Sequence, residues 1–361
     1  MSVDMNKALI ESRIVALVRG YLAAANDDAV AAACRTVMDE VVAQAVTSSE
    51  GGKRLRALLA LDAYAAAAGA TPAQDADGGH DAMLDLACAI EVFQTAALVH
   101  DDIIDDSDLR RGKPSAHRAL AAATRSDPIG TGLGIMLGDL LATASVAIAN
   151  TAARRFGDAA ALVDTFLTMH REVEVGQVLD LAVELTPLDD PQALADASLN
   201  VFRWKTASYT TIAPIELALL AAGRTPRDAR KQALAVGRPL GLAFQLADDL
   251  LDVVGSSRNT GKPVGGDIRE GKRTVLLADA LAAANDDERV ALRAMFEAPS
   301  RSDDDVRRAI SMFTATGAVD RSRERIAGLW RESRAAIGGL GLDETGRTLL
   351  EAACARFVPL A

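Results

Sequence analysis

Two aspartate clusters with the same spacing lie far apart in the sequence, Asp101-Asp102-Ile103-Ile104-Asp105 and Asp248-Asp249-Leu250-Leu251-Asp252. On a helix, the first and last aspartates of each cluster share one face about 40° apart, and the middle one is displaced by about 100°. Like charges at this spacing repel unless a cation neutralises them, and ligand sets made only of oxygen favour Mg²⁺. We predict that the three carboxylates of each cluster converge and that all six aspartates bind Mg²⁺.

A solvated acidic helix face is the alternative interpretation of either cluster. Both clusters follow apolar runs, at 95–99 and 241–247, so each is expected where a buried helix emerges from the core. Two carboxylate sets facing each other across a bundle could hold a small group of Mg²⁺ ions on a diphosphate.

Basic residues occur where a diphosphate would need them. The segment Gly51-Gly52-Lys53-Arg54-Leu55-Arg56 carries cations behind a glycine pair, and further cations follow the two aspartate clusters. These further cations are Arg110, Arg111, Lys262 and Lys272. Lysine and arginine side chains bind phosphate oxygens, although any single pair can be an ordinary surface charge. The glycine-lysine segment lacks the spacer and the Ser/Thr of a Walker loop.

The elements that position these residues are predicted to be almost entirely α-helical. Aromatic residues make up only 4% of the chain, and apolar residues recur at helical spacing, as at Leu55, Leu58, Leu59 and Leu61. Turn residues cluster at 70–79, 110–115, 127–134, 185–192, 223–227, 255–271 and 298–305, which leaves about ten or more helices. No shift in composition marks a linker, so we expect one domain over residues 1–361.

Composition also limits the possible partners and compartment. The net charge of −11 argues against a broad basic surface for nucleic acid. The three cysteines are too scattered for a disulfide framework or a zinc site. The first residues lack the pattern of a secretory signal, and the longest uncharged apolar run, 140–153, is shorter than the ~20 residues that span a bilayer. We therefore expect a cytoplasmic protein without a membrane span.

Six motifs occur in order over about residues 50 to 275. They are Gly51-Gly-Lys-Arg-Leu-Arg56, Asp101-Asp-Ile-Ile-Asp105 with Arg110-Arg-Gly112, Gly176-Gln177-Val-Leu-Asp180, Lys205-Thr206, Phe244-Gln245 with Asp248-Asp-Leu-Leu-Asp252, and Gly261-Lys262 through Gly271-Lys-Arg-Thr274. In this order they closely resemble the trans-polyprenyl diphosphate synthases, the head-to-tail prenyltransferases such as farnesyl and geranylgeranyl diphosphate synthase. The resemblance implies a single large all-α bundle around a deep central cavity, and usually a homodimer.

The resemblance also implies a role for each matching residue. The residues that match the family's metal ligands, which hold three Mg²⁺ on the allylic diphosphate, are Asp101, Asp102, Asp105, Asp248, Asp249 and Asp252. Those that match the clamp on that diphosphate are Arg110, Lys205 and Lys262. Those that match the isopentenyl diphosphate pocket are Lys53, Arg56, Gln94 and Arg111. Those that match polar positions at the reaction centre are Thr206, Gln245 and Asp180.

The chemistry implied by the resemblance is ionisation of an allylic diphosphate, which is dimethylallyl, geranyl or farnesyl diphosphate. Metals and cations stabilise the departing diphosphate, while the dipoles of Thr206 and Gln245 face the carbocation. Isopentenyl diphosphate then adds through its double bond, and by family analogy the released diphosphate takes the proton. His100 is therefore expected to pack or to form a hydrogen bond rather than to act as a general base.

Product length is expected to depend on the helix before Asp101. If Asp101 marks the diphosphate end, the growing tail extends beside this helix by about one isoprene unit per turn. One turn below, Ala96 and Ala97 are small, where relatives that stop at C15 generally place an aromatic residue; Phe93 follows about 12 Å below Asp101. We predict that Phe93 is the floor and that the product is geranylgeranyl diphosphate (C20). The alternatives are a C15 product, a product of C25 or longer, and a Phe93 that only packs in the core.

Two other functions compete with this interpretation. A terpene cyclase could share the fold and the first aspartate motif, but it would not need an isopentenyl diphosphate pocket such as Lys53, Arg56 and Arg111. A noncatalytic prenyltransferase subunit should have lost aspartates from one or both clusters, and here all six are present.

Overall fold

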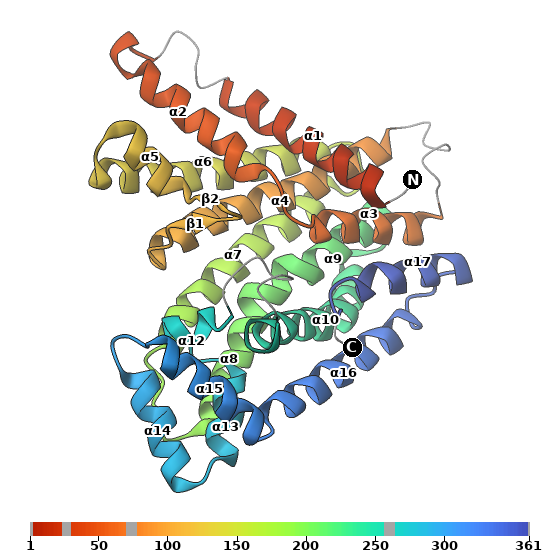
Figure 1. Ribbon diagram of the computed structural model, residues 1–361. Coiled ribbons are helices and arrows are strands. Elements are labelled where there is room, and N and C mark those ends of the chain that lie inside the picture. The colour runs from red at the N-terminus through yellow and green to blue at the C-terminus, as the bar shows by residue number, and fades with distance from the viewer. Residues whose placement is uncertain (1–2, 24–29, 70–77, 256–263, 360–361) are drawn as a thin grey trace. The chain divides into compact units, whose positions relative to one another are not determined.

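The computed structural model describes residues 3–23, 30–69, 78–255 and 264–359. Within these ranges the chain is helical apart from turns and one short hairpin (Figure 1), which confirms the predicted all-α class. The chain divides into two compact units: residues 1–167 with 214–229, and residues 168–213 with 230–361. The single-domain organisation remains a prediction.

Unit 1 is built around one buried helix, α4 (Gly79–Ile104). It packs against α1 (Val3–Ala23), α3 (Leu55–Ala68) and α6 (Asp127–Ala153). Unit 1 also contains α2 (Ala32–Ser49), the hairpin β1 (Leu109–Arg110) and β2 (Lys113–Pro114), and α5 (Ala116–Thr124). The start of α7 (Ala159–Val183), up to residue 167, and nearly all of α9 (Ala213–Ala221) also belong to unit 1, whereas the rest of α7 belongs to unit 2. The last aspartate of the first cluster caps the carboxyl end of α4, so the core helix positions that cluster.

Helix α6 begins earlier than the sequence suggests. The turn expected at 127–134 is absent because α6 is already helical from Asp127, with Pro128 in its first turn, where a missing N–H does no harm. The glycines that indicated a turn are packing residues instead. A Cβ at Gly130 would lie 2.4 Å from the backbone of Ala121, and one at Gly134 would lie 2.9 Å from His117. Close approach of α5 to α6 therefore requires these glycines.

Unit 2 carries the second cluster on the long helix α10 (Pro226–Val254). Its other helices are α8 (Pro191–Val201), α12 (Gly266–Glu270), α13 (Val275–Ala283), α14 (Asp286–Glu297), α15 (Asp303–Ala315), α16 (Ala318–Ile337) and α17 (Glu344–Ala355). Two π-helical segments, η3 (Phe202–Thr206) and η4 (Ser208–Ile212), follow α8. They pack closely on α10: a Cβ at Gly241 would lie 2.5 Å from Ala207, and the Thr211 hydroxyl donates to the Gly237 carbonyl at 2.7 Å. Irregular helix of this kind is frequent at functional sites.

Two of the described helices, α4 and α6, are long and apolar enough to cross a membrane by length and composition alone. The apolar window of α4 is 78% buried, so α4 is a core helix of the unit. The corresponding window of α6 is only 44% buried, and Ile129, Ile135 and Met136 are exposed on it. Both helices contain charged residues, so the length of uncharged runs in the sequence does not reveal them.

Candidate active site

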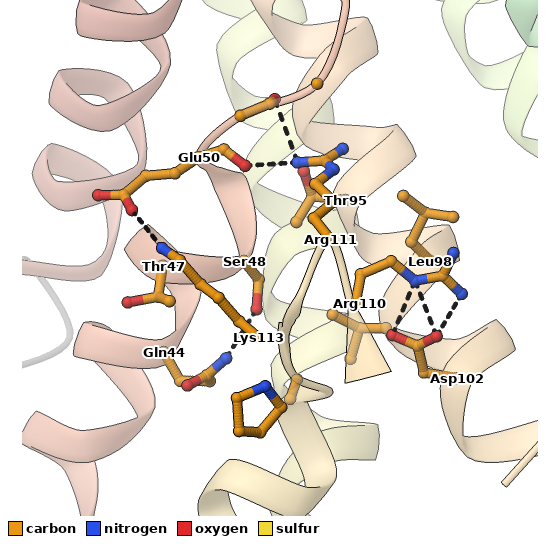
Figure 2. Close-up of a pocket in the computed structure, with 15 residues that line it drawn as sticks. Gln44, Thr47, Ser48, Glu50, Thr95, Leu98, Asp102, Arg110, Arg111 and Lys113 are labelled. Carbon is orange, nitrogen blue, oxygen red and sulfur yellow. Dashed lines mark hydrogen bonds and ion pairs between the residues drawn. The ribbon is translucent and has the colours of Figure 1, made fainter. Parts of the chain in front are cut away.

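A cavity of about 320 Å³ lies in unit 1 between the carboxyl ends of α2 and α4, the loop after α2, and the hairpin (Figure 2). Its polar lining includes Gln44, Thr47, Ser48, Asp102, Arg110, Arg111 and Lys113. Binding sites for small molecules typically measure about 300–1,000 Å³, so this volume suits a small ligand. The three cations favour an anionic one.

The glycine loop on one wall of this cavity is sharply turned. Gly51 and Gly52 have φ angles of 74° and 94°, and Arg54 also has a positive φ of 55°. Arg111 lies against this loop, since its Nη1 donates to the carbonyl oxygens of Glu50 at 2.5 Å and Gly51 at 3.2 Å. A Cβ at Gly52 would lie 3.2 Å from the Arg111 guanidinium. The glycine pair therefore allows this arginine to approach the backbone.

Side chains of the hairpin contact both α4 and the glycine loop. Arg111 and Gly112 form its two-residue turn with φ angles of 52° and 76°, the sign that a tight type I′ turn requires. Arg110 pairs across the hairpin with Lys113. Arg110 Nε donates to Asp102 Oδ1 at 2.9 Å, and Lys113 Nζ lies 3.0 Å from Glu50 Oε2 (Figure 2). One short element thus carries three of the cavity's cations.

The local charges show that the cavity favours an anion. Burial and the neighbouring guanidiniums of Arg54, Arg110 and Arg56 lower the pKa of Arg111, and the carboxylate of Glu91 offsets part of this effect. Burial is the largest influence on Arg110 and acts to lower its pKa, but the hydrogen bond to Asp102 and the charges of Asp102, Asp101 and Asp105 together outweigh it, so the pKa is raised overall. A diphosphate would relieve the repulsion between these guanidiniums.

The three aspartates of the first cluster have different surroundings. Asp102 is 2% exposed and paired with Arg110, whereas Asp101 is half-buried and Asp105 is exposed. Within the described residues, no three acidic, histidine or cysteine side chains lie close enough together to hold a metal ion. The middle residue of this cluster faces the hairpin arginine, and binding of Mg²⁺ by the three carboxylates stays a prediction.

The second cluster, in unit 2, also buries its middle residue. Asp249 is 6% exposed, and its Oδ1 accepts a hydrogen bond from Gln245 Nε2 at 2.8 Å. Gln245 Oε1 in turn accepts from the Thr206 hydroxyl at 2.9 Å. Asp252 accepts from the backbone N–H groups of Gly266 and Asp267 at 3.1 and 3.0 Å. Among the described residues, Asp249 Oδ2 is buried without a hydrogen-bond partner.

A fourth carboxylate, Asp267, lies beside the three of this cluster and was not predicted from the sequence. Burial, opposed by Lys272 and reinforced by Asp252, raises the pKa of Asp267 to about 6. Burial and Asp267 likewise raise the pKa of Asp249. The signal in the sequence was an aspartate directly after a glycine pair and shortly before Lys272, whose Nζ lies 3.5 Å from Asp267 Oδ1. Excess buried negative charge and an unpartnered carboxylate oxygen fit a divalent cation.

Lys205 is held by the motif predicted around Gly176. Its Nζ donates to Asp180 Oδ2 at 2.7 Å. A Cβ at Gly176 would lie 2.2 Å from the backbone nitrogen of Lys205, so glycine is required for η3 to pack on α7. Lys205, Thr206 and Gln245 therefore lie in the same unit as the second cluster.

Other predicted residues are placed as follows. Lys53 is exposed, Arg56 is buried and Gln94 is half-buried. The cavity lining from α4 consists of Thr95, Leu98, Val99 and Asp102 and does not include Gln94. Phe93 and Ala96 are buried and Ala97 is half-buried. Lys262 lies outside the described residues. His100 packs on Gly138, and its Nε2 lies 3.2 Å from the Ile135 carbonyl oxygen, as expected for a packing and hydrogen-bonding role.

Comparisons with known proteins identify the family of this chain. The sequence model of the family described as polyprenyl synthetase matches residues 36–313. The chain is 33% identical to a short chain isoprenyl diphosphate synthase of Methanothermobacter thermautotrophicus over 75% of both chains. It is 34% identical to a geranylfarnesyl diphosphate synthase of Aeropyrum pernix, over 76% of this chain and 79% of that one. Among solved structures, it is similar to the geranylgeranyl pyrophosphate synthase of Corynebacterium glutamicum complexed with isoprenyl diphosphate and magnesium, with a TM-score of 0.80, 31% identity and full coverage of both chains.

Proposed function

Because this chain belongs to the polyprenyl synthetase family and is a trans-polyprenyl diphosphate synthase, we propose that its main product is geranylgeranyl diphosphate (C20). The substrates are isopentenyl diphosphate and an allylic starter, which is dimethylallyl, geranyl or farnesyl diphosphate. The observation that carries the assignment of an isopentenyl diphosphate pocket is the cation-lined cavity of unit 1, where Arg111 lies on the glycine loop.

Each substrate is assigned its own set of side chains. Arg111, with Lys53, Arg56 and Gln94, binds isopentenyl diphosphate, and the structure adds Thr95 and Lys113 as candidate contacts because both line the cavity. The allylic diphosphate is bound by Arg110, Lys205 and Lys262, with Lys272 nearby in the sequence. Lys205 is already oriented by Asp180.

The six aspartates are assigned to about three Mg²⁺ ions, a number that rests on the family resemblance. Asp249 Oδ2 supports this assignment, as it is buried without a hydrogen-bond partner among the described residues. Bound Mg²⁺ would neutralise the charge of the departing diphosphate. The Thr206 hydroxyl donates to Gln245, so the oxygens of this pair are fixed where they can face positive charge. No side-chain nucleophile is required.

The C20 product rests on helix α4. Over the two turns that precede Asp101, the side chains at Ala96 and Ala97 leave room beside the helix, and Phe93 is the first phenylalanine about 12 Å below. Phe93 is 1% exposed, so it is held in one place by its neighbours. We assign Phe93 as the floor that stops elongation.

We also infer a homodimer that covers α6. This helix leaves Ile129, Ile135 and Met136 exposed, between 41% and 53%, along an otherwise apolar helix. A second copy of the chain would bury such a face. Light scattering of the purified protein tests this state: a dimer mass is expected, and a monomer at micromolar concentration would contradict it.

The function is tested with purified protein, Mg²⁺, radiolabelled isopentenyl diphosphate and each of the three allylic starters in turn. All three reactions should end mainly at C20 when the products are dephosphorylated and separated by reversed-phase chromatography. A main product of C15, or of C25 and longer, would refute the C20 assignment but leave the synthase activity. Cyclised hydrocarbon in place of linear alcohols would refute head-to-tail transfer.

A further inference from the structure

We propose that Arg54 and Glu91 form a buried positioning pair that holds the glycine loop in the shape needed to bind isopentenyl diphosphate. The inference rests on the proposed function, because it concerns the pocket assigned there to this substrate. Neither residue is among the predicted substrate ligands. Arg54 lies between two of them, Lys53 and Arg56, and Glu91 lies in the core helix α4.

The geometry of the pair ties both ends of the loop to α4. Arg54 Nη1 lies 3.4 Å from Glu91 Oε2, and Arg54 Nη2 donates to the carbonyl oxygen of Ser49, the last residue of α2. The other carboxylate oxygen, Glu91 Oε1, accepts from the backbone N–H of Ala57 at 3.1 Å. The side chains of Arg54 and Glu91 are 1% and 2% exposed. The loop from Ser49 to Ala57 is therefore anchored at both ends by one ion pair.

Glu91 also replaces a missing helix cap. Helix α3 begins after Arg54, which has a left-handed backbone and provides no side-chain cap. Ala57 is the third residue of α3, so its N–H has no partner within the helix. A carboxylate supplied by α4 satisfies it and interacts favourably with the positive end of the helix dipole. The orientation of the first turn of α3, which carries Arg56, thus depends on Glu91.

Arg54 and Glu91 differ from the predicted substrate ligands in their burial and in their charge environment. Lys53 is exposed whereas Arg54 is 3% exposed, so the two adjacent cations point to different environments. Arg54, Arg56 and Arg110 all act to lower the pKa of Arg111, and Glu91 acts to raise it. A buried carboxylate in this position cannot itself bind a diphosphate. It makes the close assembly of guanidiniums possible and leaves their outer edge to the substrate.

Weakening the Arg54–Glu91 pair should affect the binding of isopentenyl diphosphate more than that of the allylic substrate. A loop that must be ordered on binding costs affinity, whereas a loop that is already ordered does not. Weakening the pair should therefore raise the KM for isopentenyl diphosphate, because misplacing a binding group by about 1 Å can cost up to about a hundredfold. The KM for the allylic substrate and kcat at saturating isopentenyl diphosphate should change little, because Lys205 and the second cluster belong to unit 2 whereas the loop belongs to unit 1.

The test uses Glu91→Gln, which keeps the shape of the side chain and one carbonyl oxygen for Ala57 but removes the nearer and buried of the two carboxylate charges beside Arg54; the other, Glu11, lies 3.8 Å from Arg54 Nε. We expect the KM for isopentenyl diphosphate to rise about tenfold, with kcat and the allylic KM within about twofold of wild type. Amide hydrogen exchange over residues 50–58 should accelerate, a readout that does not depend on activity. The matched control is Asp85→Asn. Asp85 lies on the same helix as Glu91 and forms a partly exposed ion pair with Arg13 of α1, so its replacement should change neither the KM for isopentenyl diphosphate nor hydrogen exchange over residues 50–58.

A second variant covers the case in which Glu91→Gln fails to fold. Arg54→Lys keeps a cation opposite Glu91 but loses the forked guanidinium that contacts Ser49 and Glu91 together. It should shift the isopentenyl diphosphate KM in the same direction. Wild-type values for the folded variant, or an equal rise in both KM values with a fall in kcat, would overturn the proposal. If wild-type protein forms no prenyl product, the proposed function fails, and the hydrogen-exchange result then reports separately on whether the pair orders the loop.

Discussion

The two aspartate clusters have the same sequence spacing but different surroundings. In both, the middle aspartate is buried, at 2% exposure for Asp102 and 6% for Asp249. Asp102 is neutralised by the guanidinium of Arg110. Asp249 has a neutral amide from Gln245 and the nearby charge of Asp267, and the structure records no hydrogen bond for its Oδ2. The same pattern thus gives one cluster whose middle aspartate is already paired with an arginine and one whose middle aspartate keeps an oxygen available for a cation.

The largest effect is expected when the leading aspartate of either cluster is removed. Asp101→Ala and Asp248→Ala should each lower kcat by about a thousandfold, since losing a metal ligand forfeits several kcal/mol of charge stabilisation in the transition state. Helix content should be unchanged, and the thermal midpoint should not fall because each substitution relieves repulsion. Near-normal turnover of either variant at saturating Mg²⁺ would refute the assignment of that cluster as a set of metal ligands. The comparison of the two clusters as metal sites would then fail.

A smaller and selective effect is expected from the cations of the two units. Arg111→Ala should raise the KM for isopentenyl diphosphate by about ten- to a hundredfold, as lost charge-assisted hydrogen bonds cost ~1.5–3 kcal/mol. Lys205→Ala, its counterpart in unit 2, should instead raise the KM for the allylic substrate. Steady-state kinetics with each substrate varied in turn separates the two. Equal weakening of both substrates by Arg111→Ala would count against separate pockets.

Replacing Asp102 or Asp249 with asparagine removes the charge and keeps the shape of the side chain. These two variants test the difference between the clusters directly. Without Mg²⁺, Asp102→Asn should destabilise the protein by about 1–3 kcal/mol, because it leaves the Arg110 guanidinium without its carboxylate. Asp249→Asn should be neutral or stabilising by about 1 kcal/mol, because it removes a buried charge that lies near another carboxylate. Urea unfolding measures both changes. If both variants lose the same stability, the two clusters do not differ in their need for a cation.

The smallest expected effect is a change in the length of the product. Ala96→Phe should shorten the main product by about one isoprene unit and Phe93→Ala should lengthen it, because each substitution moves the obstruction by about one helical turn. Turnover should stay within about tenfold of wild type. Chromatography of the dephosphorylated products gives the chain lengths. An unchanged chain length in both variants would show that this face of α4 does not measure the product.

Much of the fold and the outline of the site could be predicted from the sequence. Helical spacing and turn residues correctly indicated an all-α chain, and the aspartate, glycine and lysine motifs identified the family. Local spacing could not show that Asp102 faces Arg110, because that contact depends on the hairpin. The glycines at the start of α6 were misinterpreted because glycine serves both turns and close packing, and only the position of α5 distinguishes the two.

Long-range contacts account for the other omissions. Asp267 becomes important only because the segment after α10 returns to place it beside Asp252, a contact between residues that no helical period connects. Glu91 looked like one polar residue in an apolar helix, and its role depends on Ala57 and Arg54 of a different helix and loop. The close packing at Lys205 and Ala207 likewise depends on glycines of neighbouring helices, Gly176 and Gly241.

The central claim, that both clusters bind divalent metal with an allylic diphosphate, is tested most directly by anomalous diffraction. Crystals would be grown with Mn²⁺ in place of Mg²⁺, isopentenyl diphosphate and an unreactive thio-analogue of farnesyl diphosphate. We predict anomalous peaks within coordination distance of the carboxylates of both aspartate clusters. Peaks at only one cluster, or at neither while the analogue is bound, would contradict the account.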